Sequence, residues 1–183
     1  MNIFELTSGD IQRCSIVLEN GQTCYAVESN KLGNHTVIRE GGREGRVLAT
    51  IVRHGFKADT IQFEGSPSVS VGSWLKSGFL GLGRGLPASF NHIGRKYTWK
   101  HTDKDTIAVF ASDSPHPIAT YHKPPPYRLA KEGLTLSIHS HVEEGLKDLI
   151  VISLVDIEYS RRVKTVEQER DYSAAATYAT LRA

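Results

Sequence analysis

The sequence has no apolar run long enough to cross a lipid bilayer. Its most apolar stretch, Leu149–Val155, is seven residues long and contains Ser153, whereas a membrane-spanning helix needs about 18 apolar residues. The opening segment Met1–Leu6 lacks the basic start and the apolar stretch of a secretory signal. We therefore expect a protein that is not integral to a membrane and lies in the cytoplasm, with the nucleus or the membrane periphery as alternative locations.

An excess of one charge sign is also missing. The 183 residues include 22 Lys and Arg against 20 Asp and Glu, which gives a formal net charge of +2. This excess is too small to indicate nucleic acid binding, which depends on a strongly basic surface. With 39% hydrophobic and 23% charged residues, the composition is that of an ordinary globular protein, and the length suits one domain with a sizeable core.

Cysteine is scarce, with Cys14 and Cys24 as the only two. The pair Asn20–Gly21 predicts a two-residue hairpin turn. In that register Val17 faces Cys24 and Cys14 faces Val27, so the two thiols lie on opposite faces and cannot form a disulfide with each other. We expect Cys14 to be a small core residue, Cys24 to be partly exposed, and both thiols to be reduced.

The segment Ser140–Lys164 is predicted to form a helix. Ser140 followed by Glu143 fits a capping box, and acidic residues at the start with basic residues at the end match the helix macrodipole. The apolar residues between them leave no polar face wide enough to meet water, so the helix must be buried on most sides. Because Leu149–Ile157 is also rich in β-branched residues, a long central strand is the alternative.

Short alternating apolar segments, separated by turn signals, precede this helix and predict strands. The expected strands are Ile3–Leu6, Cys14–Leu18, Thr23–Glu28, His35–Arg39, Arg46–Arg53, Thr60–Phe63, Ser68–Val71, Arg95–Lys100, Thr106–Ala111, Ile118–His122 and Leu134–Ile138. This order predicts a mainly β fold, a barrel of about twelve mostly antiparallel strands around the C-terminal hydrophobic helix. We expect residues 1–165 to form a single domain with helix 140–164 at its centre. Residues 166–183 are expected to form a tail that either extends the helix or hangs free.

Several segments resemble an uncharacterised fungal family, frequent in mushrooms and catalogued as domain of unknown function 6593. These segments are Phe4–Ser8, Gly94–Lys100, Pro117–His122 and Leu146–Arg162. More broadly, the pattern is similar to the tubby-like barrel of tubby C-terminal domains, phospholipid scramblases and LURP-one-related proteins. This resemblance covers roughly residues 1–165 and implies a closed barrel around one hydrophobic helix. It carries no catalytic residues, and a lipid function inferred from it is an analogy of fold.

A stretch without any acidic residue, Gly65–Thr102, is the candidate binding region. The candidate ligand-binding residues within it are Lys76, Arg84, Arg95, Lys96, Lys100, Trp74 and Phe79. A surface with such basic and aromatic residues can meet the phosphates of anionic lipid head groups. The alternative is that the aromatic residues alternate into the barrel while the basic residues merely coat its outside.

No pattern in the sequence indicates a catalytic, metal or cofactor site. There is no G-x-S-x-G motif, and the pair His139 and His141 is not followed by a Cys or His at zinc-site spacing, so we expect no metal and no cofactor. The remaining candidates for acid or base chemistry are His122, Asp156 and His141. Asp156 lies in an apolar helix, where a carboxylate is costly unless it is paired, and we expect a structural pairing.

These patterns favour a binding module without catalytic activity, whose ligand is an anionic lipid head group or a protein partner. One alternative is a small enzyme with a His and Asp site at the barrel mouth, which needs at least two of the three acid–base candidates within hydrogen-bond reach. A second alternative is a self-associating structural or interaction protein that uses the loop Gly78–Leu86 or the tail. The sequence does not indicate the oligomeric state.

Overall fold

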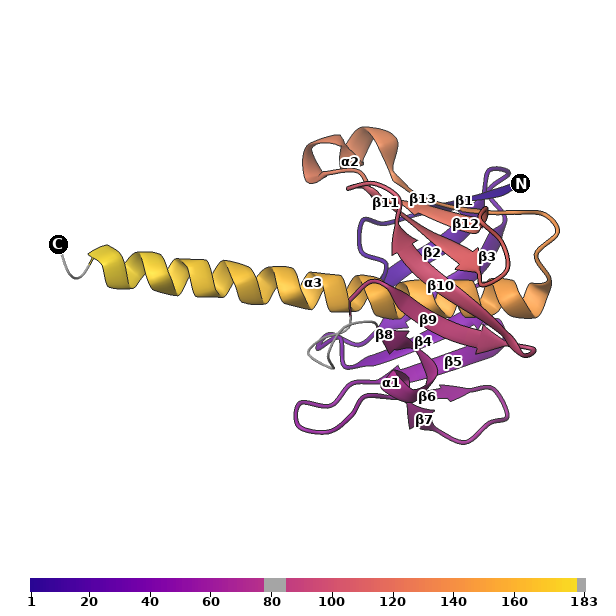
Figure 1. Cartoon of the computed structure of the whole chain (residues 1–183), viewed down its shortest axis with the longest axis horizontal. Helices are drawn as coiled ribbons and strands as arrows, with labels where there is room; N and C mark the ends of the chain where they lie inside the picture. Colours follow the sequence, from indigo (N-terminus) through magenta and orange to yellow (C-terminus); the bar gives the residue numbers. More distant parts are fainter. Residues whose placement is uncertain (78–84, 181–183) are drawn as a thin grey trace.

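A computed structural model describes residues 1–77 and 85–180, with the backbone alone for residues 164–180. These residues form thirteen strands and three helices (Figure 1). The strands are β1 (Asn2–Leu6), β2 (Arg13–Leu18), β3 (Thr23–Ser29), β4 (His35–Glu40), β5 (Val47–Val52), β6 (Thr60–Phe63), β7 (Val69–Ser70), β8 (Lys76–Ser77), β9 (Ala88–His92), β10 (Arg95–His101), β11 (Thr106–Ala111), β12 (Pro117–His122) and β13 (Leu134–Ile138). The helices are α1 (Val71–Trp74), α2 (Pro126–Glu132) and α3 (Glu144–Thr180).

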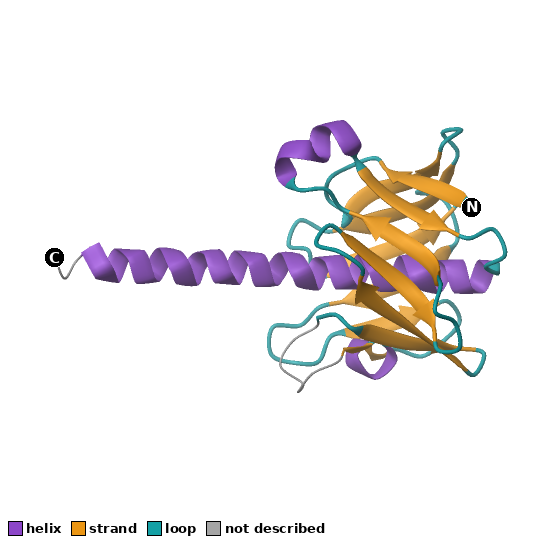
Figure 2. Ribbon diagram, turned by 45° about the horizontal axis from the view of Figure 1, so that its top comes forward, coloured by secondary structure: helices purple, strands orange, loops and turns teal. Residues whose placement is uncertain are grey.

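All the described strands belong to one antiparallel sheet, which confirms the mainly β prediction. Their order is β7-β6-β5-β4-β3-β2-β1-β13-β12-β11-β10-β9-β8. Strand β1 therefore pairs with both β2 and β13, and Asn2 lies opposite Ile138. The sheet curls around α3, so strands lie on both sides of the helix (Figure 2). Most pairings join consecutive strands, as expected from the short turns that connect them.

The prediction that the sheet closes into a barrel is wrong. Within the described residues the two edge strands β7 and β8 are not hydrogen-bonded to each other. The chain passes directly from one edge to the other through α1, where the Leu75 backbone N–H donates to the Val71 carbonyl at 2.7 Å. The backbone groups in this seam, the junction between the edges β7 and β8, are thus hydrogen-bonded within a helical turn. They are not available for hydrogen bonds between the two edge strands.

Aromatic side chains fill the seam between the two edges. The Trp74 ring at the end of α1 lies 5.1 Å from the Phe63 ring of β6, measured between centroids, and 6.2 Å from the Phe90 ring of β9. Phe90 in turn stacks on Tyr97 of β10 at 5.6 Å. Edge-to-face and offset contacts at these distances are favourable. Side-chain packing, and not backbone pairing, therefore holds the two edges together.

Helix α3 is the centre of the core, as predicted, and the central-strand alternative is wrong. Every residue from Ile150 to Glu158 is buried. The helix begins at Glu144 and not at the expected Ser140, because the preceding residues form a turn in which the Val142 N–H donates to the His139 carbonyl. The Glu143 carbonyl then accepts from the Leu146 and Lys147 N–H groups, which is the first hydrogen bonding of the helix.

The helix continues far past the sheet. Its backbone runs to Thr180, and residues 164–180 project beyond the last strands (Figures 1 and 2). At about 1.5 Å per residue the whole helix is about 55 Å long, roughly twice the extent of the part enclosed by the sheet. Among the described residues, no helix combines the length and the apolar content that crossing a bilayer requires.

The β2–β3 hairpin keeps the predicted pairing of Cys14 with Val27 but not the predicted turn. A bulge between Ile16 and Val17 places Val17 opposite Thr23, so Cys24 does not face it. The connection is longer than the expected two residues, with the Leu18 N–H donating to the Gln22 carbonyl. Both thiols are free, Cys14 is buried and Cys24 is partly exposed, as expected.

The two thiols are expected to react at very different rates. Burial, with a smaller contribution from Asp10, raises the pKa of the Cys14 thiol to about 12, so it stays protonated at neutral pH. Iodoacetamide should label Cys24 in the folded protein and leave Cys14 unmodified until urea is added, as measured by intact-mass spectrometry, because the thiolate is the nucleophile. Equal labelling of both cysteines without urea would contradict the buried position of Cys14.

Candidate functional site

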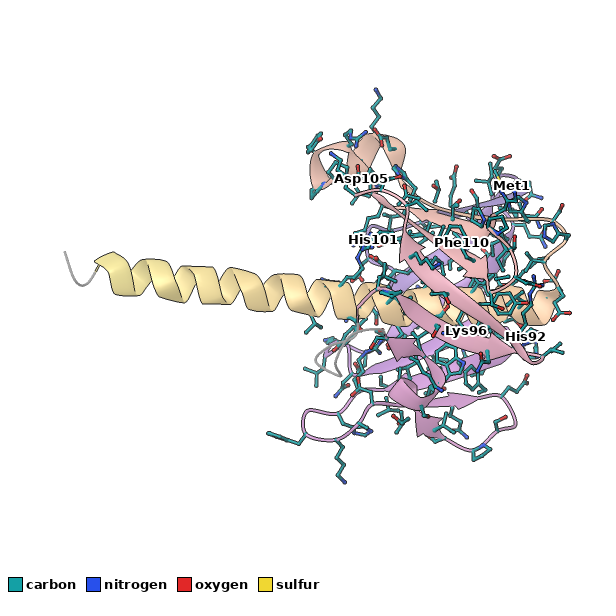
Figure 3. The ribbon with its side chains drawn as sticks, viewed as in Figure 1. Met1, His92, Lys96, His101, Asp105 and Phe110 are labelled. Carbon is teal, nitrogen blue, oxygen red and sulfur yellow. The ribbon has the colours of Figure 1, made fainter. Side chains whose placement is uncertain are left out.

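Strand β10 places its side chains on two different faces of the sheet. Tyr97 and Trp99 are buried on the inner face, where Trp99 Nε1 donates to Ser153 Oγ of α3 at 2.9 Å. Lys96 and Lys100 are exposed on the outer face. The alternation of aromatic and basic residues is what a half-buried strand requires, since successive side chains point to opposite faces. Figure 3 shows Lys96 on the outward side of the sheet.

The strand register brings Lys76 to the same outer face. Lys76 of β8 lies opposite Ser89 of β9, and Ser89 lies opposite Thr98 of β10. Because Thr98 is midway between Lys96 and Lys100, the three lysines surround it; we name this set the lysine face. From ordinary strand spacings, the Cα atoms of Lys96 and Lys100 are about 13 Å apart and that of Lys76 is about 12 Å from each. This spacing suits several separate negative charges better than one small anion.

A shallow groove crosses part of the lysine face beside α1. Its volume is about 260 Å³, and its lining residues are Ser73, Trp74, Lys76, Ser89, Phe90, Asn91 and Lys96. No carboxylate belongs to this described lining. Ser89 Oγ donates to the Lys76 carbonyl at 3.4 Å, so the donors that the groove keeps for anionic oxygens are the two lysine amines and the Asn91 amide.

The three lysines of the lysine face have no carboxylate partner within the described residues, whereas most of the described arginines have one. Arg46, for example, contacts Glu40 and Glu64 at 2.7 Å each. None of the three lysines has an ion pair in the part of the chain that the structure describes, and Lys100 Nζ lies 5.4 Å from the centroid of the Phe110 ring. Lysines on separate loops and on α2 also lack an ion pair within the described residues; these are Lys31, Lys57, Lys104 and Lys131.

Arg95 was predicted to belong to the same binding surface, but it lies on the other face of β10. It shares the inner face with Tyr97, and its guanidinium carbon is 5.7 Å from the centroid of that ring. Arg95 Nε donates to Asp113 Oδ1 at 2.8 Å, and this hydrogen bond holds the pKa of Asp113 below its usual 3.8. The charge of Arg95 is therefore already paired with a carboxylate and does not add to the lysine face.

Of the remaining candidates, Trp74, Arg84 and Phe79, the structure describes only Trp74. Trp74 lines the groove, and its ring also packs in the seam against Phe63 and Phe90, so it has a structural role there as well. Arg84 and Phe79 lie outside the described residues, as does most of the loop that was considered for self-association. The structure thus brings together three of the predicted basic residues and one aromatic residue.

The three candidates for acid or base chemistry have separate surroundings. His122 Nδ1 lies 3.3 Å from Thr106 Oγ1, and its Nε2 lies 3.6 Å from Glu132 of α2. Asp156 is buried on α3, twelve residues and about 18 Å beyond the start of the helix, whereas His141 precedes that start. Within the described residues no hydrogen bond or ion pair joins any two of them, so they do not form the shared acid–base site that the enzyme alternative requires.

The histidine pair near α3 does not build a metal site with other residues. The rings of His139 and His141 are 5.4 Å apart, tilted at 47°. Within the described residues, no three His, Cys, Asp or Glu side chains are grouped so that they could hold a metal ion. A separate histidine, His92, contacts Glu143 at the start of α3 and packs over Gly145, where a Cβ would lie 3.6 Å from the ring.

Sequence reasoning missed the residues of β9 that line the groove. Ser89 and Asn91 point outward while Ala88 and Phe90 are buried, so the strand does alternate. The signal is only five residues long and follows Pro87 and a glycine-rich segment, which together predict a loop. The alternation of Ser89, Phe90 and Asn91 was the available evidence for a strand.

The fold and the lysine face define a mainly β protein in which a curled antiparallel sheet encloses one long helix and carries a basic outer surface. A family model matches residues 9–163, and the chain therefore belongs to the family of unknown function DUF6593. No curated protein and no solved structure is significantly similar to the chain. The family supplies no activity, so a function has to be argued from the site.

Proposed function

We propose that this protein is a non-enzymatic binding module that holds anionic lipid head groups on its lysine face. The observation that supports this is the grouping of Lys76, Lys96 and Lys100 on one outer surface without ion pairs in the described structure. The groove beside them offers the Asn91 amide and contains no carboxylate among its described lining residues. The spacing of about 12–13 Å matches a membrane surface, where negative charges recur, better than a single bound ion.

The binding free energy in this proposal is mainly electrostatic. Each lysine close to an anionic membrane contributes about 1 kcal/mol, and this attraction falls off within a Debye length of about 8 Å at physiological ionic strength. Among the described aromatic residues beside the three lysines, Trp74 is packed in the seam and Phe110 lies beneath the Lys100 amine, so neither is placed for deep insertion. Binding is therefore expected to weaken steeply as salt is added.

Neutralising the lysine face tests the proposal. The triple substitution Lys76→Gln, Lys96→Gln and Lys100→Gln should weaken binding to vesicles containing phosphatidylserine and phosphoinositide about a hundredfold, since three contributions of about 1 kcal/mol are lost. Vesicle flotation over a series of lipid concentrations, at low and physiological salt, measures the change. Vesicles of phosphatidylcholine alone should not bind.

A matched control separates the lysine face from net charge. The triple substitution Lys57→Gln, Lys104→Gln and Lys131→Gln removes the same charge from three exposed positions on different segments. It should leave vesicle binding within about twofold of the unmodified protein, because none of those lysines belongs to the lysine face. Equal losses in both triple variants, or no binding of the unmodified protein at low salt, would contradict the proposal.

The curled sheet around an apolar helix is also compatible with the tubby-like architecture that the sequence resembles, and we include that relationship in the proposal. Under it, the protein would act at the cytoplasmic surface of a membrane and not within the bilayer. The support is limited to the order of elements, with strands first and one buried helix last. A fold alone does not specify a ligand, so the vesicle experiment carries the functional claim.

A further inference from the structure

A second hollow lies where α3 leaves the curled sheet, away from the lysine face. Its volume is about 410 Å³, within the range of small-molecule sites. The lining residues are Asp10, Gln12, Arg13, Ser29, Lys31, Leu32, Gly33, Tyr159, Arg162 and Val163. They come from the β1–β2 connection and the start of β2, from the end of β3 and the β3–β4 connection, and from α3, so the hollow exists only in the folded protein.

Buried hydrogen bonds hold the polar floor of this hollow in one orientation. The Gln12 amide nitrogen donates to the Val155 carbonyl of α3 at 3.1 Å. The Gln12 Oε1 atom accepts from the Ser29 and Thr36 hydroxyls, each at 3.1 Å. Gln12 is only 5% exposed and Thr36 is fully buried, so these bonds are shielded from water. A floor that is already ordered costs a ligand little reorganisation on binding.

Positive charge dominates the rim of the hollow. Arg13 Nη2 donates to the Asn30 carbonyl at 2.7 Å and its Nε donates to the Ser29 carbonyl at 3.3 Å, which fixes the guanidinium. Its Nη1 has no acceptor in the described part of the chain. Lys31 likewise has no ion pair among the described residues, and Arg162 contacts Asp10, the one carboxylate in the lining, at 2.9 Å. A negatively charged group would therefore find unneutralised donors here.

An aromatic ring and aliphatic side chains also belong to the lining. The Arg53 guanidinium carbon lies 3.6 Å from the centroid of the Tyr159 ring, so a stacked cation sets the orientation of that ring. Gly33 has a φ of +70°, and a Cβ at this position would lie 3.9 Å from the ring. Leu32 and Val163 complete the apolar side. Together these residues offer a flat apolar contact beside the cationic rim.

We infer that this hollow is a binding site for a small organic anion, in which a phosphate or carboxylate meets Arg13 and Lys31 while a compact apolar body lies along Tyr159. The site goes beyond the lipid-binding proposal, because it uses a different surface and a ligand that is not part of a membrane. Both phosphate and carboxylate fit the same donors, so the experiment compares them directly.

Titrations with phenyl phosphate, benzoate and inorganic phosphate, followed by amide chemical shifts in NMR, test the inference. Phenyl phosphate or benzoate should bind in a saturable way, with shifts centred on residues 10–13, 29–33 and 159–163. Inorganic phosphate should bind about tenfold more weakly, because it lacks the apolar body and so gives up about 1.4 kcal/mol. No saturable binding by either aromatic anion, or equal binding by inorganic phosphate, would overturn the inference.

The variant Lys31→Gln gives the sharpest result, because Lys31 is exposed and its loss should not affect folding. It should raise the dissociation constant of the aromatic anion about tenfold, which corresponds to the loss of one charge-assisted contact. The control Lys57→Gln removes the same charge from the neighbouring β5–β6 loop and should change nothing. Lys96→Gln should also leave anion binding intact, which keeps the outcome independent of the lysine face. Unchanged affinity in Lys31→Gln would overturn the proposed site.

Discussion

The substitution Asp156→Leu is expected to lower the free energy of unfolding by about 3–5 kcal/mol, the usual effect of removing one member of a buried ion pair. Asp156 is 1% exposed, and its Oδ1 accepts from Arg53 Nη2 at 3.4 Å. Arg53 also donates from Nη1 to Thr36 Oγ1 at 3.1 Å, which connects the pair to the polar floor of the hollow. Without the carboxylate, the guanidinium stays buried in a site that had been arranged around two opposite charges.

Two further variants make this prediction specific to the buried pair. The double substitution Arg53→Met and Asp156→Leu should recover most of the lost stability, since replacing both charges by apolar side chains is often close to neutral. The control Arg43→Met breaks the exposed contact with Glu28 and should cost no more than about 1 kcal/mol. Urea unfolding followed by far-ultraviolet circular dichroism measures all three. If the Asp156→Leu variant were as stable as the unmodified protein, that result would contradict the role of the pair.

The substitution Trp99→Ala is expected to cost a similar amount, about 3–5 kcal/mol. Trp99 is fully buried on the inner face of β10, and its Nε1 donates to Ser153 Oγ of α3 at 2.9 Å. The substitution therefore leaves a cavity between sheet and helix and removes the donor that Ser153 accepts from. Ser153 Oγ still donates to the Ile150 carbonyl at 3.0 Å, so the hydroxyl itself remains bonded.

A second variant separates the cavity from the hydrogen bond. The double substitution Trp99→Phe and Ser153→Ala keeps most of the buried volume and removes both polar partners, which can be nearly neutral when the shape is preserved. Its unfolding free energy should lie within about 2 kcal/mol of the unmodified protein. Trp99→Ala should lose more in the same urea titration. If both variants were equally destabilised, cavity formation would not be the main cause of the loss.

Much of the sheet follows from local pattern. Leu134–Ile138 alternates clearly, and its bounds were predicted. Thr23–Ser29 does not alternate, since Tyr25, Ala26 and Val27 are all buried, but the turn residues around it placed it to within a residue. The strand β8 was missed because two residues are too few to show an alternating pattern. Helix α2 was missed because the run of prolines before Tyr127 indicates a stiff loop, yet Pro126 occupies the first turn, where a missing N–H costs nothing.

The candidate site was predicted only in part, for a reason that is visible in β10. Lys96 and Arg95 are adjacent in the sequence and equally basic, but they point to opposite faces, and only Lys96 belongs to the lysine face. Alternate residues of a strand share a face of the sheet. Which of the two faces is the inner one is decided only by the element that packs on it, here α3. The hollow beside Tyr159 had no sequence signal, because its residues come from three distant segments.

The sequence alone determined that the chain is mainly β and that its apolar helix is enclosed, because residue periodicity and an all-round apolar surface are local properties. The tertiary structure alone decided how the sheet ends meet, where α1 inserts Trp74 in place of a ladder. It also decided which charges are paired. Arg53 and Asp156 are 103 positions apart, and no local pattern records that they meet in the core, because that contact depends on how the whole sheet curls around the helix.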